Sequence, residues 1–239
     1  YCGTDINVQC GSTQMEPLRA LVADCPADVG PAHDGDADRV MLMDSEGNEI
    51  DGDMVEAVCA IDLKQRGLLV GDTAVSTVMA NLGLTHALRD AGINLIQTKV
   101  GDRYVLEAMR EGGYVIGGEQ SGHTIFLEHN STGDGLVTAL QFLAACKRAG
   151  KSAGEAAKAM TRFPQTLINV RVKDKHAADG NQAIADAVAA AEAALGEDGR
   201  VLLRPSGTEP VVRVMVEAMD QQAAEQHAKA IAEVVEREI

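Results

Sequence analysis

Residues 68–100 read LLVGDTAVSTVMANLGLTHALRDAGINLIQTKV. The pattern opens with a strand and its exit loop over residues 68–78, and residues 82–90 carry the apolar spacing of a helix that Gly92 ends. A second strand over residues 93–100 follows. A strand, a helix and another strand in this order predict a βα unit with parallel strands. This stretch therefore places the chain in the α/β class.

The same rhythm continues on both sides of this stretch. Further helices are predicted over residues 54–66, 102–110 and 135–148, and a further strand over residues 114–116. Gly67 and Gly112-Gly113 mark where the first two of these helices end. The sequence thus predicts a domain built from βα units around a parallel or mixed sheet.

A different pattern begins near Arg162-Phe163-Pro164. We expect a boundary at residues 160–166, followed by a small α+β domain. Its predicted elements are strands over 167–172, 201–203 and 211–217 and helices over 181–195 and 221–238. A second boundary is expected near residue 52, after a Gly- and Asp-rich region in which residues 39–43 read as a buried strand. The predicted parts are therefore residues 1–52, 53–163 and 164–239.

Composition excludes several classes of function. The chain has 239 residues, 36 Asp and Glu against 21 Lys and Arg, and a net charge of −15, so it is a poor binder of nucleic acid or of anionic membranes. It has no Trp, which argues against stacking platforms for bases. No apolar run approaches the roughly 18 residues of a membrane span.

Cysteine usage points to a reducing compartment. The five cysteines are an odd and scattered set with no C-x-x-C pair, which argues against a disulfide framework or a zinc cluster. We expect a cytoplasmic protein.

The first motif with chemical content is His33-Asp-Gly-Asp-Ala-Asp-Arg39. Asp34, Asp36 and Asp38 alternate along a Gly-bearing loop directly before a strand, so their carboxylates can converge on one hard cation such as Mg²⁺ or Ca²⁺. An EF-hand is excluded, because its sixth and twelfth loop positions would hold Arg39 and Ser45 instead of Gly and Glu. The alternative is a solvated acidic turn.

The second motif is Gly117-Gly-Glu-Gln-Ser-Gly-His123, directly after a predicted strand. Its glycines allow the backbone to approach a ligand closely. Glu119, Ser121 and His123 offer both donors and acceptors, which a polyhydroxylated ligand requires. A tight polar turn explains the pattern equally well.

The third motif is Leu203-Arg-Pro-Ser-Gly-Thr-Glu-Pro210, with Arg213 beyond it. An arginine, two hydroxyls and a Gly-bearing backbone form a phosphate cradle in chemical terms, although the P-loop pattern is absent. The alternative is a Pro- and Gly-rich hairpin loop. A fourth segment, Lys99-Val-Gly-Asp-Arg103, could contact an anion through Lys99, and helix capping by Asp102 explains part of it.

These motifs, in this order and with these gaps, resemble the α-D-phosphohexomutase superfamily. Asp34–Arg39 is similar to its metal-binding loop, Gly118–His123 to its sugar-binding loop and Arg204–Thr208 to its phosphate-binding loop. The sugar loop reads Gly-Glu-Gln-Ser-Gly-His, where related phosphomannomutases and phosphoglucomutases more often carry Glu-Met-Ser. Gln120 therefore favours the branch that acts on glucosamine phosphates.

The resemblance implies that the chain is the carboxy-terminal half of such an enzyme. Residues 1–52 would be the end of a preceding α/β domain with the metal loop, residues 53–163 the sugar-binding domain, and residues 164–239 the phosphate-binding domain. The family's catalytic serine lies in the amino-terminal half, and no serine of this chain stands in that motif. The isolated chain is thus expected to be inactive and to need the missing half as its partner.

The resemblance also implies a reaction, which is the interconversion of glucosamine 6-phosphate and glucosamine 1-phosphate through a phosphoserine and a 1,6-bisphosphate. Such an isomerase would serve amino-sugar nucleotide and cell-wall precursor synthesis. The implied roles are Mg²⁺ ligands for Asp34, Asp36 and Asp38, and catalysis for Arg39 and His123, the latter as a proton shuttle. The implied substrate contacts are Lys99, Glu119, Ser121, Arg204, Ser206, Gly207, Thr208 and Arg213.

Other interpretations stay open at this point. The parent enzyme could be a phosphomannomutase or phosphoglucomutase, or the chain could be a sugar-phosphate-binding fragment without catalysis. A phosphatase with a nucleophilic aspartate is disfavoured, because Asp34-Gly-Asp36 does not continue as D-x-D-x-T. The sequence leaves open whether the protein forms a homodimer.

Overall fold

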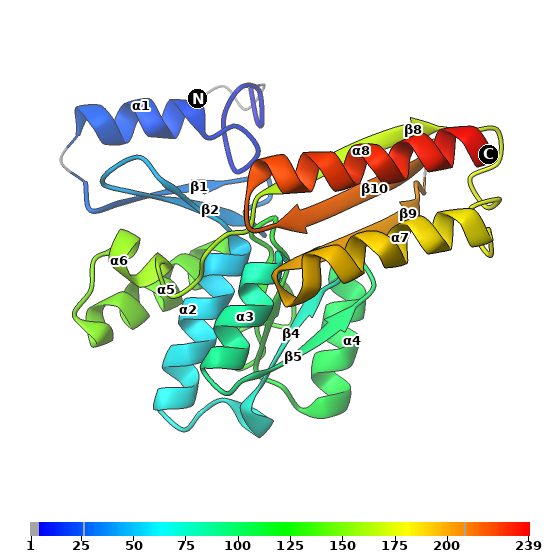
Figure 1. The fold of residues 1–239 in the computed structure, drawn as a ribbon. Helices are drawn as coiled ribbons and strands as arrows, with labels where there is room; N and C mark the ends of the chain where they lie inside the picture. Colours follow the sequence, from blue (N-terminus) through cyan, green and yellow to red (C-terminus); the bar gives the residue numbers. More distant parts are fainter. Residues whose placement is uncertain (1–4, 26, 208) are drawn as a thin grey trace. The chain divides into compact units, whose positions relative to one another are not determined.

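The βα units predicted from the sequence form the centre of the first of two units, residues 1–161, in the computed structural model (Figure 1). The structure describes residues 5–25, 27–207 and 209–239. The four-stranded sheet has the order β5-β4-β6-β7, in which β4 is parallel to β5 and β6, and β7 runs antiparallel to β6. Its strands are β4 (Thr73–Thr77), β5 (Asn94–Thr98), β6 (Ile116–Gly118) and β7 (Thr124–Phe126). The α/β class and the mixed sheet are confirmed.

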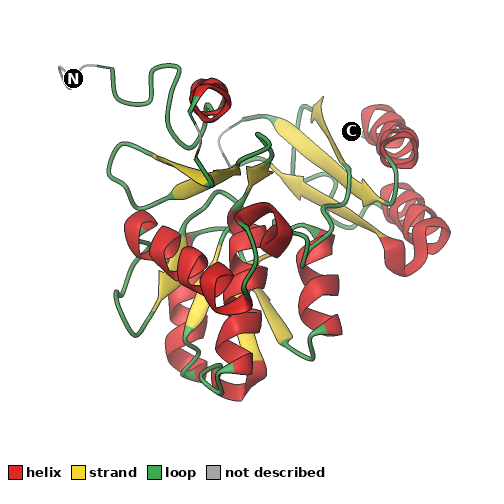
Figure 2. Ribbon diagram, turned by 90° about the vertical axis from the view of Figure 1, so that its left-hand side faces the viewer, coloured by secondary structure: helices red, strands yellow, loops and turns green. Residues whose placement is uncertain are grey.

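Helices cover both faces of this sheet (Figure 2). On one face, Ala74 and Ile116 belong to a large apolar core with α2, α3 and α5. On the other face, Val75 and Ile125 pack against Val105 and Met109 of α4. These helices are α2 (Gly52–Gln65), α3 (Leu82–Asp90), α4 (Asp102–Gly112) and α5 (Gly135–Ala149), and a short α6 (Ala153–Ala157) follows.

Side-chain caps and glycines set the ends of these helices. Asp51 Oδ1 accepts a hydrogen bond from Met54 N at 3.1 Å at the start of α2, and Asp134 Oδ1 accepts one from Val137 N at 2.9 Å at the start of α5. Gly150 ends α5 in the left-handed conformation that glycine adopts most readily. Local sequence therefore fixes where α2 and α5 begin beside the loops described below.

A smaller antiparallel sheet, β1-β2-β3, belongs to the same unit. It consists of β1 (Val29–His33), β2 (Val40–Asp44) and β3 (Glu49–Ile50), with α1 (Glu16–Asp24) beside it. Val40, Leu42 and Ile50 share the core of α2 and α5. Residues 5–52 are thus packed into the same unit as the larger sheet, while the division into residues 1–52, 53–163 and 164–239 remains a prediction.

The second unit, residues 162–239, is the small α+β fold expected from the sequence. Its sheet has the order β8-β10-β9 and is antiparallel throughout. The strands are β8 (Gln165–Arg171), β9 (Gly199–Pro205) and β10 (Val211–Ala218), and the helices are α7 (Gln182–Leu195) and α8 (Gln221–Glu238). Val212, Val214 and Val216 point to the side of the sheet that packs on both helices. The intervening residues of β10, including Arg213, lie on the opposite side.

Two predicted strands are displaced. A strand and its exit loop were expected over residues 68–78, whereas a 3-10 turn over Val70–Asp72 comes first and β4 follows it at Thr73–Thr77. The sequence favoured residues 114–116, whereas β6 spans Ile116–Gly118. Gly117 pairs with Val75, and a Cβ at Gly117 would lie 2.7 Å from the Val75 carbonyl oxygen, so only glycine allows this close pairing. Among the described residues, no helix combines the length and the apolar character that crossing a bilayer requires.

Candidate active site

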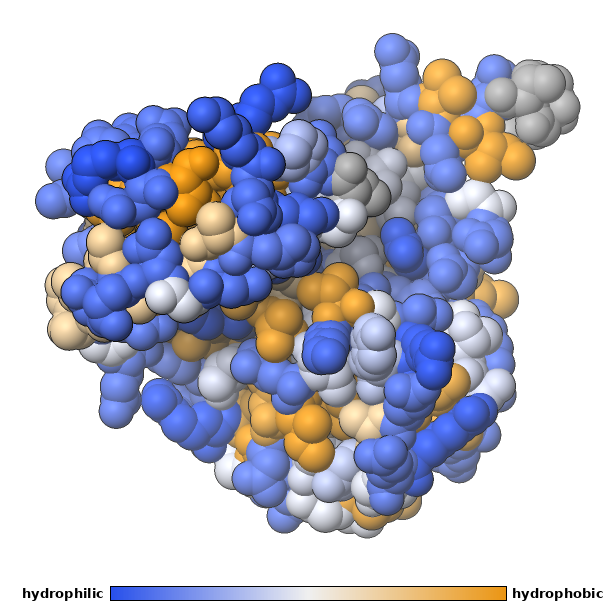
Figure 3. Space-filling view, turned by 90° about the vertical axis from the view of Figure 1, so that its right-hand side faces the viewer, coloured by the Kyte–Doolittle hydropathy of each residue, from blue (hydrophilic) through white to orange (hydrophobic). Residues whose placement is uncertain are grey.

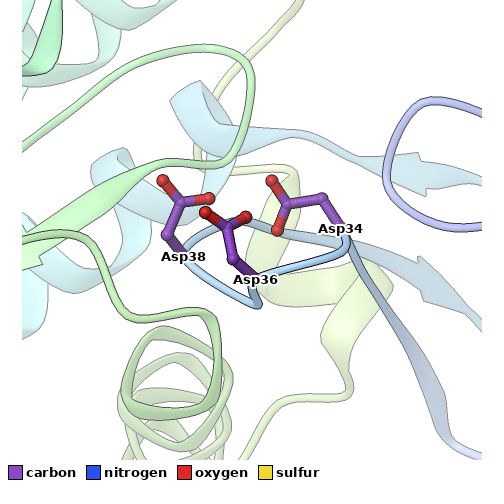
Figure 4. A group of neighbouring side chains, drawn as sticks. All are labelled: Asp34, Asp36 and Asp38. Carbon is purple, nitrogen blue, oxygen red and sulfur yellow. The ribbon is translucent and has the colours of Figure 1, made fainter. Parts of the chain in front are cut away.

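The aspartate loop, residues 34–39, connects β1 to β2. Its backbone is held by Asp34, whose Oδ1 accepts a hydrogen bond from Arg39 N at 3.1 Å and whose main-chain oxygen accepts one from Ala37 N at 3.3 Å. Ala37 has a positive φ of 58°, which is uncommon for a residue with a side chain and is concentrated at functional sites. This tight turn places the three aspartates on one side of the loop, with their carboxylates turned toward one another (Figure 4).

The carboxylates of Asp34, Asp36 and Asp38 can each offer an oxygen such that all three lie within 4.8 Å of one another. Burial raises the pKa of Asp38, and the hydrogen bond and negative charge of Asp34 raise it further. Arg39 Nε lies 3.9 Å from both Asp34 Oδ2 and Asp38 Oδ1 and offsets part of this repulsion. A set of three carboxylate oxygens on one loop fits a hard divalent cation such as Mg²⁺.

His123 is buried next to the aspartate loop. Its side chain is 3% exposed, and its Nε2 lies 3.5 Å from Asp38 Oδ2. Gly133 faces the ring, and a Cβ there would lie 2.4 Å from Nε2. The structure thus places His123 in contact with a candidate metal ligand, while its proposed proton-shuttle role remains a prediction.

The sugar loop, residues 118–123, begins at the last residue of β6 and contains the tight turn that leads to β7. Glu119 N donates to His123 O at 2.9 Å, and Gly122 N donates to Glu119 O at 3.0 Å. Glu119 is half-buried and Ser121 is exposed, with 3.5 Å between Ser121 Oγ and Glu119 Oε2. These two side chains therefore offer an acceptor and a hydroxyl next to each other, which suits the hydroxyl groups of a sugar.

The sugar loop is hydrogen-bonded to Val40, the first residue of β2, directly after the aspartate loop. Val40 N donates to Gly122 O at 3.1 Å, and a Cβ at Gly122 would lie 2.3 Å from Val40 O. The beginning of α5 joins the same cluster, since Gly135 N donates to Ala37 O at 2.9 Å. Two motifs that are far apart in the sequence are thus brought together within the first unit.

The segment 99–103 also reaches the sugar loop. Gly101 N donates to Glu119 Oε1 at 3.1 Å. The exposed Lys99 precedes this contact by two residues in the sequence. Gly101 is the N-cap of α4, and no side-chain capping bond forms there, so the capping explanation for Asp102 is not supported. Arg103 pairs along the helix with Glu107, at 2.7 Å between Nε and Oε1.

The first two turns of α2 carry two buried acidic residues next to the sugar loop. The sequence did not reveal this contact. Asp53 and Glu56 are fully buried. Asp53 Oδ2 accepts hydrogen bonds from Asn81 N at 2.8 Å and from Gln120 Nε2 at 3.1 Å. The only signal in the sequence was Glu56, an acidic residue inside the helix predicted over residues 54–66.

The phosphate loop of the second unit lies between β9 and β10. Arg204 and Arg213 are paired directly across these strands. Burial, and then the positive charge of Arg213, lowers the pKa of Arg204. Arg213 Nη2 lies 3.5 Å from Glu209 Oε2. Two cations in opposite positions favour an anion between them.

Ser206 and Lys175 organise the backbone of this loop. Ser206 is buried, its N donates to Val211 O at 2.9 Å, and its Oγ accepts from Glu209 N at 3.3 Å. Lys175 Nζ donates to Ser206 O at 2.6 Å and lies 3.4 Å from Gly207 O. Sequence reasoning missed Lys175 because it lies outside the motif. Thr208 is outside the described residues.

Comparisons with known proteins match both units to domains of one protein family. Residues 51–163 match the family model described as phosphoglucomutase/phosphomannomutase, alpha/beta/alpha domain III, and residues 167–234 match the model of the C-terminal domain of the same family. A curated protein of Frankia alni called phosphoglucosamine mutase is 57% identical over 98% of this chain. One of the same name from Thermoanaerobacter pseudethanolicus is 53% identical over 99% of it. The chain spans 51% and 54%, respectively, of the length of these relatives.

Solved structures share the fold. The N-acetylphosphoglucosamine mutase of Aspergillus fumigatus, crystallised with GlcNAc-6P and magnesium, superposes with a TM-score of 0.78 at 21% identity over 96% of this chain and 57% of that one. A substrate complex of N-acetylglucosamine-phosphate mutase, described as a member of the α-D-phosphohexomutase superfamily, gives a TM-score of 0.75 at 23% identity, over 96% of this chain and 53% of that one.

Proposed function

Because this chain belongs to the phosphoglucomutase/phosphomannomutase family, we propose that it is the carboxy-terminal half of a phosphoglucosamine mutase. The parent enzyme would interconvert glucosamine 6-phosphate and glucosamine 1-phosphate. The observation that carries the proposal is the hydrogen bond between Val40 N and Gly122 O, since it attaches the strand that directly follows the loop of three carboxylates to a loop of sugar-type donors and acceptors. The names of the relatives that are 53–57% identical support the choice of substrate.

In this proposal the aspartate loop holds Mg²⁺ through Asp34, Asp36 and Asp38. A bound cation would offset the negative charge that gathers on a transferring phosphoryl group, which is the main requirement of phosphoryl transfer. Arg39 lies beside two of these carboxylates and would contact the same phosphoryl group. The fungal relative crystallised with magnesium supports this choice of metal.

The other motifs supply binding. Glu119 and Ser121 would hydrogen-bond to sugar hydroxyls, and Lys99 would add a positive charge beside them. Arg204, Arg213, Ser206, Gly207 and Thr208 would bind the phosphate that is not being transferred. The cross-strand pair Arg204–Arg213 supports this role, because two opposed cations lose their repulsion once an anion lies between them.

The nucleophilic serine of the proposed reaction belongs to the half of the parent that this chain does not include. We expect that half to pack against exposed apolar side chains of the first unit. Ile6, Val8 and Leu21 are 59%, 58% and 57% exposed, and Figure 3 shows apolar groups exposed on the face that it draws. We place the parent in the cytoplasm from its cysteine usage.

The test is a coupled mutase assay on glucosamine 6-phosphate with Mg²⁺ and a trace of the 1,6-bisphosphate. The chain alone is expected to be inactive, and addition of the parent's first half is expected to restore turnover. Turnover by the chain alone would place the nucleophile within these residues and overturn the assignment of roles. A preference for mannose 6-phosphate over glucosamine 6-phosphate would favour a phosphomannomutase instead.

A further inference from the structure

The sugar loop is attached to the start of α2 by its main chain. Gly52 N donates to Gln120 O at 3.1 Å. A Cβ at Gly52 would lie 2.1 Å from Glu119 O and 2.8 Å from Gly122 N, so the loop is in direct contact with the helix. The positive end of the helix dipole faces the loop carbonyls at this point.

A side-chain contact completes this attachment. Gln120 turns toward α2, where its Nε2 donates to Asp53 Oδ2 at 3.1 Å. Asp53 is 0% exposed, and the same oxygen accepts Asn81 N at 2.8 Å. A buried carboxylate is stable only when donors surround it, and hydrogen bonds to a charged acceptor are about twice as strong as neutral ones.

The underside of the loop is held as well. Ser76 Oγ donates to Gly118 O at 3.0 Å, and Glu56 Oε2 lies 3.4 Å from the place where a Cβ of Gly118 would be. Burial, and then the negative charge of Asp53, raises the pKa of Glu56 well above its usual range, which favours the protonated form of this carboxyl group beside the loop.

These contacts distinguish Gln120 from its two polar neighbours in the loop, Glu119 and Ser121. Gln120 is directed at α2, whereas Glu119 contacts Gly101 N and Ser121 is exposed. Because Gln120 is hydrogen-bonded to α2, the loop backbone holds Glu119 and Ser121 in one arrangement. Fixing the arrangement in advance removes an entropic cost from binding.

We propose that Asp53 and Gln120 are positioning residues that lock the sugar loop onto α2, so that Glu119 and Ser121 face the sugar while Gln120 does not contact it. The part that concerns the sugar rests on the proposed function, and the lock itself does not.

The lock is tested in this chain without ligand, by residue-resolved amide hydrogen exchange. The reporters are the amides of Val40, Gly52, Glu119 and Gly122, all of which hydrogen-bond to or within the loop. Gln120→Met keeps the side-chain length and removes the donor to Asp53. The matched control is Gln65→Met, at the exposed last residue of the same helix.

We expect Gln120→Met to speed exchange at these amides by about tenfold, because a hydrogen bond to a charged group contributes about that factor. Gln65→Met and the amides of β10 should not change. Gln120→Glu places a second carboxylate against Asp53 and should have a larger effect, which Asp53→Asn in the same chain should partly reverse. Exchange within about twofold of the original chain in both Gln120 variants would overturn the lock.

A second measurement separates positioning from direct contact. In the enzyme completed with the parent's first half, Gln120→Met is expected to raise KM for glucosamine 6-phosphate while kcat falls less. A raised KM with unchanged exchange would assign Gln120 to the sugar and overturn the proposal. Faster exchange in an enzyme that never turns over this substrate would leave the lock standing and refute the proposed function instead.

Discussion

Arg204 and Arg213 occupy directly opposite positions on β9 and β10, two neighbouring antiparallel strands. Like charges in such positions destabilise a sheet by up to about 1 kcal/mol. Arg213 Nη2 lies 3.5 Å from Glu209 Oε2, and burial, followed by the positive charge of Arg213, lowers the pKa of Arg204. A bound phosphate would relieve this repulsion, so the pair connects ligand binding to the stability of the second unit.

Inorganic phosphate is therefore expected to raise the unfolding temperature of the second unit, and Arg213→Met is expected to abolish most of this rise. Without phosphate, the same substitution should leave stability unchanged or raise it by about 0.2–1 kcal/mol, because the repulsion is removed. Calorimetric scans with and without phosphate measure both effects. Arg237→Met, on the exposed end of α8, is the control, and an equal phosphate-dependent shift in both variants would contradict a role for Arg213.

Lys175 is expected to hold the phosphate loop in its binding shape. Lys175→Met removes the ammonium that donates to Ser206 O, so inorganic phosphate should bind more weakly by about tenfold, since a charged hydrogen bond contributes on that order. Titration calorimetry checks this. Lys173→Met makes the same charge change two residues earlier on an exposed side chain, and equal losses in the two variants would point to net charge as the cause.

Glu56 gives the first unit a pH dependence of known sign. The unfolded chain releases the Glu56 proton above roughly pH 4.3, whereas the folded chain keeps it up to the raised pKa. In this window the folded state binds more protons, so its stability falls as pH rises, by about 1.4 kcal/mol for each unit of the raised pKa. Glu56→Gln should remove this fall, and Glu111→Gln on the exposed face of α4 should not. Urea unfolding between pH 5 and pH 8 measures the difference, and parallel curves for Glu56→Gln and the original chain would refute it.

Asp36 is expected to contribute to cation binding more than to folding, because it is the most exposed of the three aspartates. Asp36→Asn should weaken Mg²⁺ binding by about tenfold, or about 1.4 kcal/mol, and should leave the unfolding temperature unchanged. Asp90→Asn, at the exposed end of α3, is the matched control. Titration calorimetry with Mg²⁺ is the measurement. Unweakened binding in Asp36→Asn would show that the cation lies elsewhere.

The sequence predicted those parts of the fold that depend on local pattern. The helices that became α2 and α3 were visible from apolar spacing and from the glycines that follow them, Gly67 and Gly92, and α5 was visible from apolar spacing alone. The strand β6 was misplaced by two residues, because the pairing of Gly117 with Val75 depends on the absence of a Cβ and not on an apolar pattern.

In the site, too, local features could be predicted and long-range contacts could not. Asp34, Asp36 and Asp38 lie on one short loop, so their convergence could be predicted from spacing. The contact between Gln120 and Asp53 joins residues that are 67 positions apart, and that between Lys175 and Ser206 joins residues 31 positions apart. Such contacts form only when the fold brings distant segments together. No spacing rule reveals them, and a buried Asp53 in the first turn of a helix reads from sequence as an ordinary helix-start residue.

The hydrogen bonds from Val40 to Gly122 and from Gly52 to Gln120 have a consequence for recombination between homologous genes. A crossover near residue 52 would join an aspartate loop and a sugar loop that had not diverged together. The backbones of the two newly combined segments would have to fit together as closely at Gly52 and Gly122, where any side chain would collide with backbone. Viable chimaeras of this family should therefore take the aspartate loop and the sugar loop from the same parent.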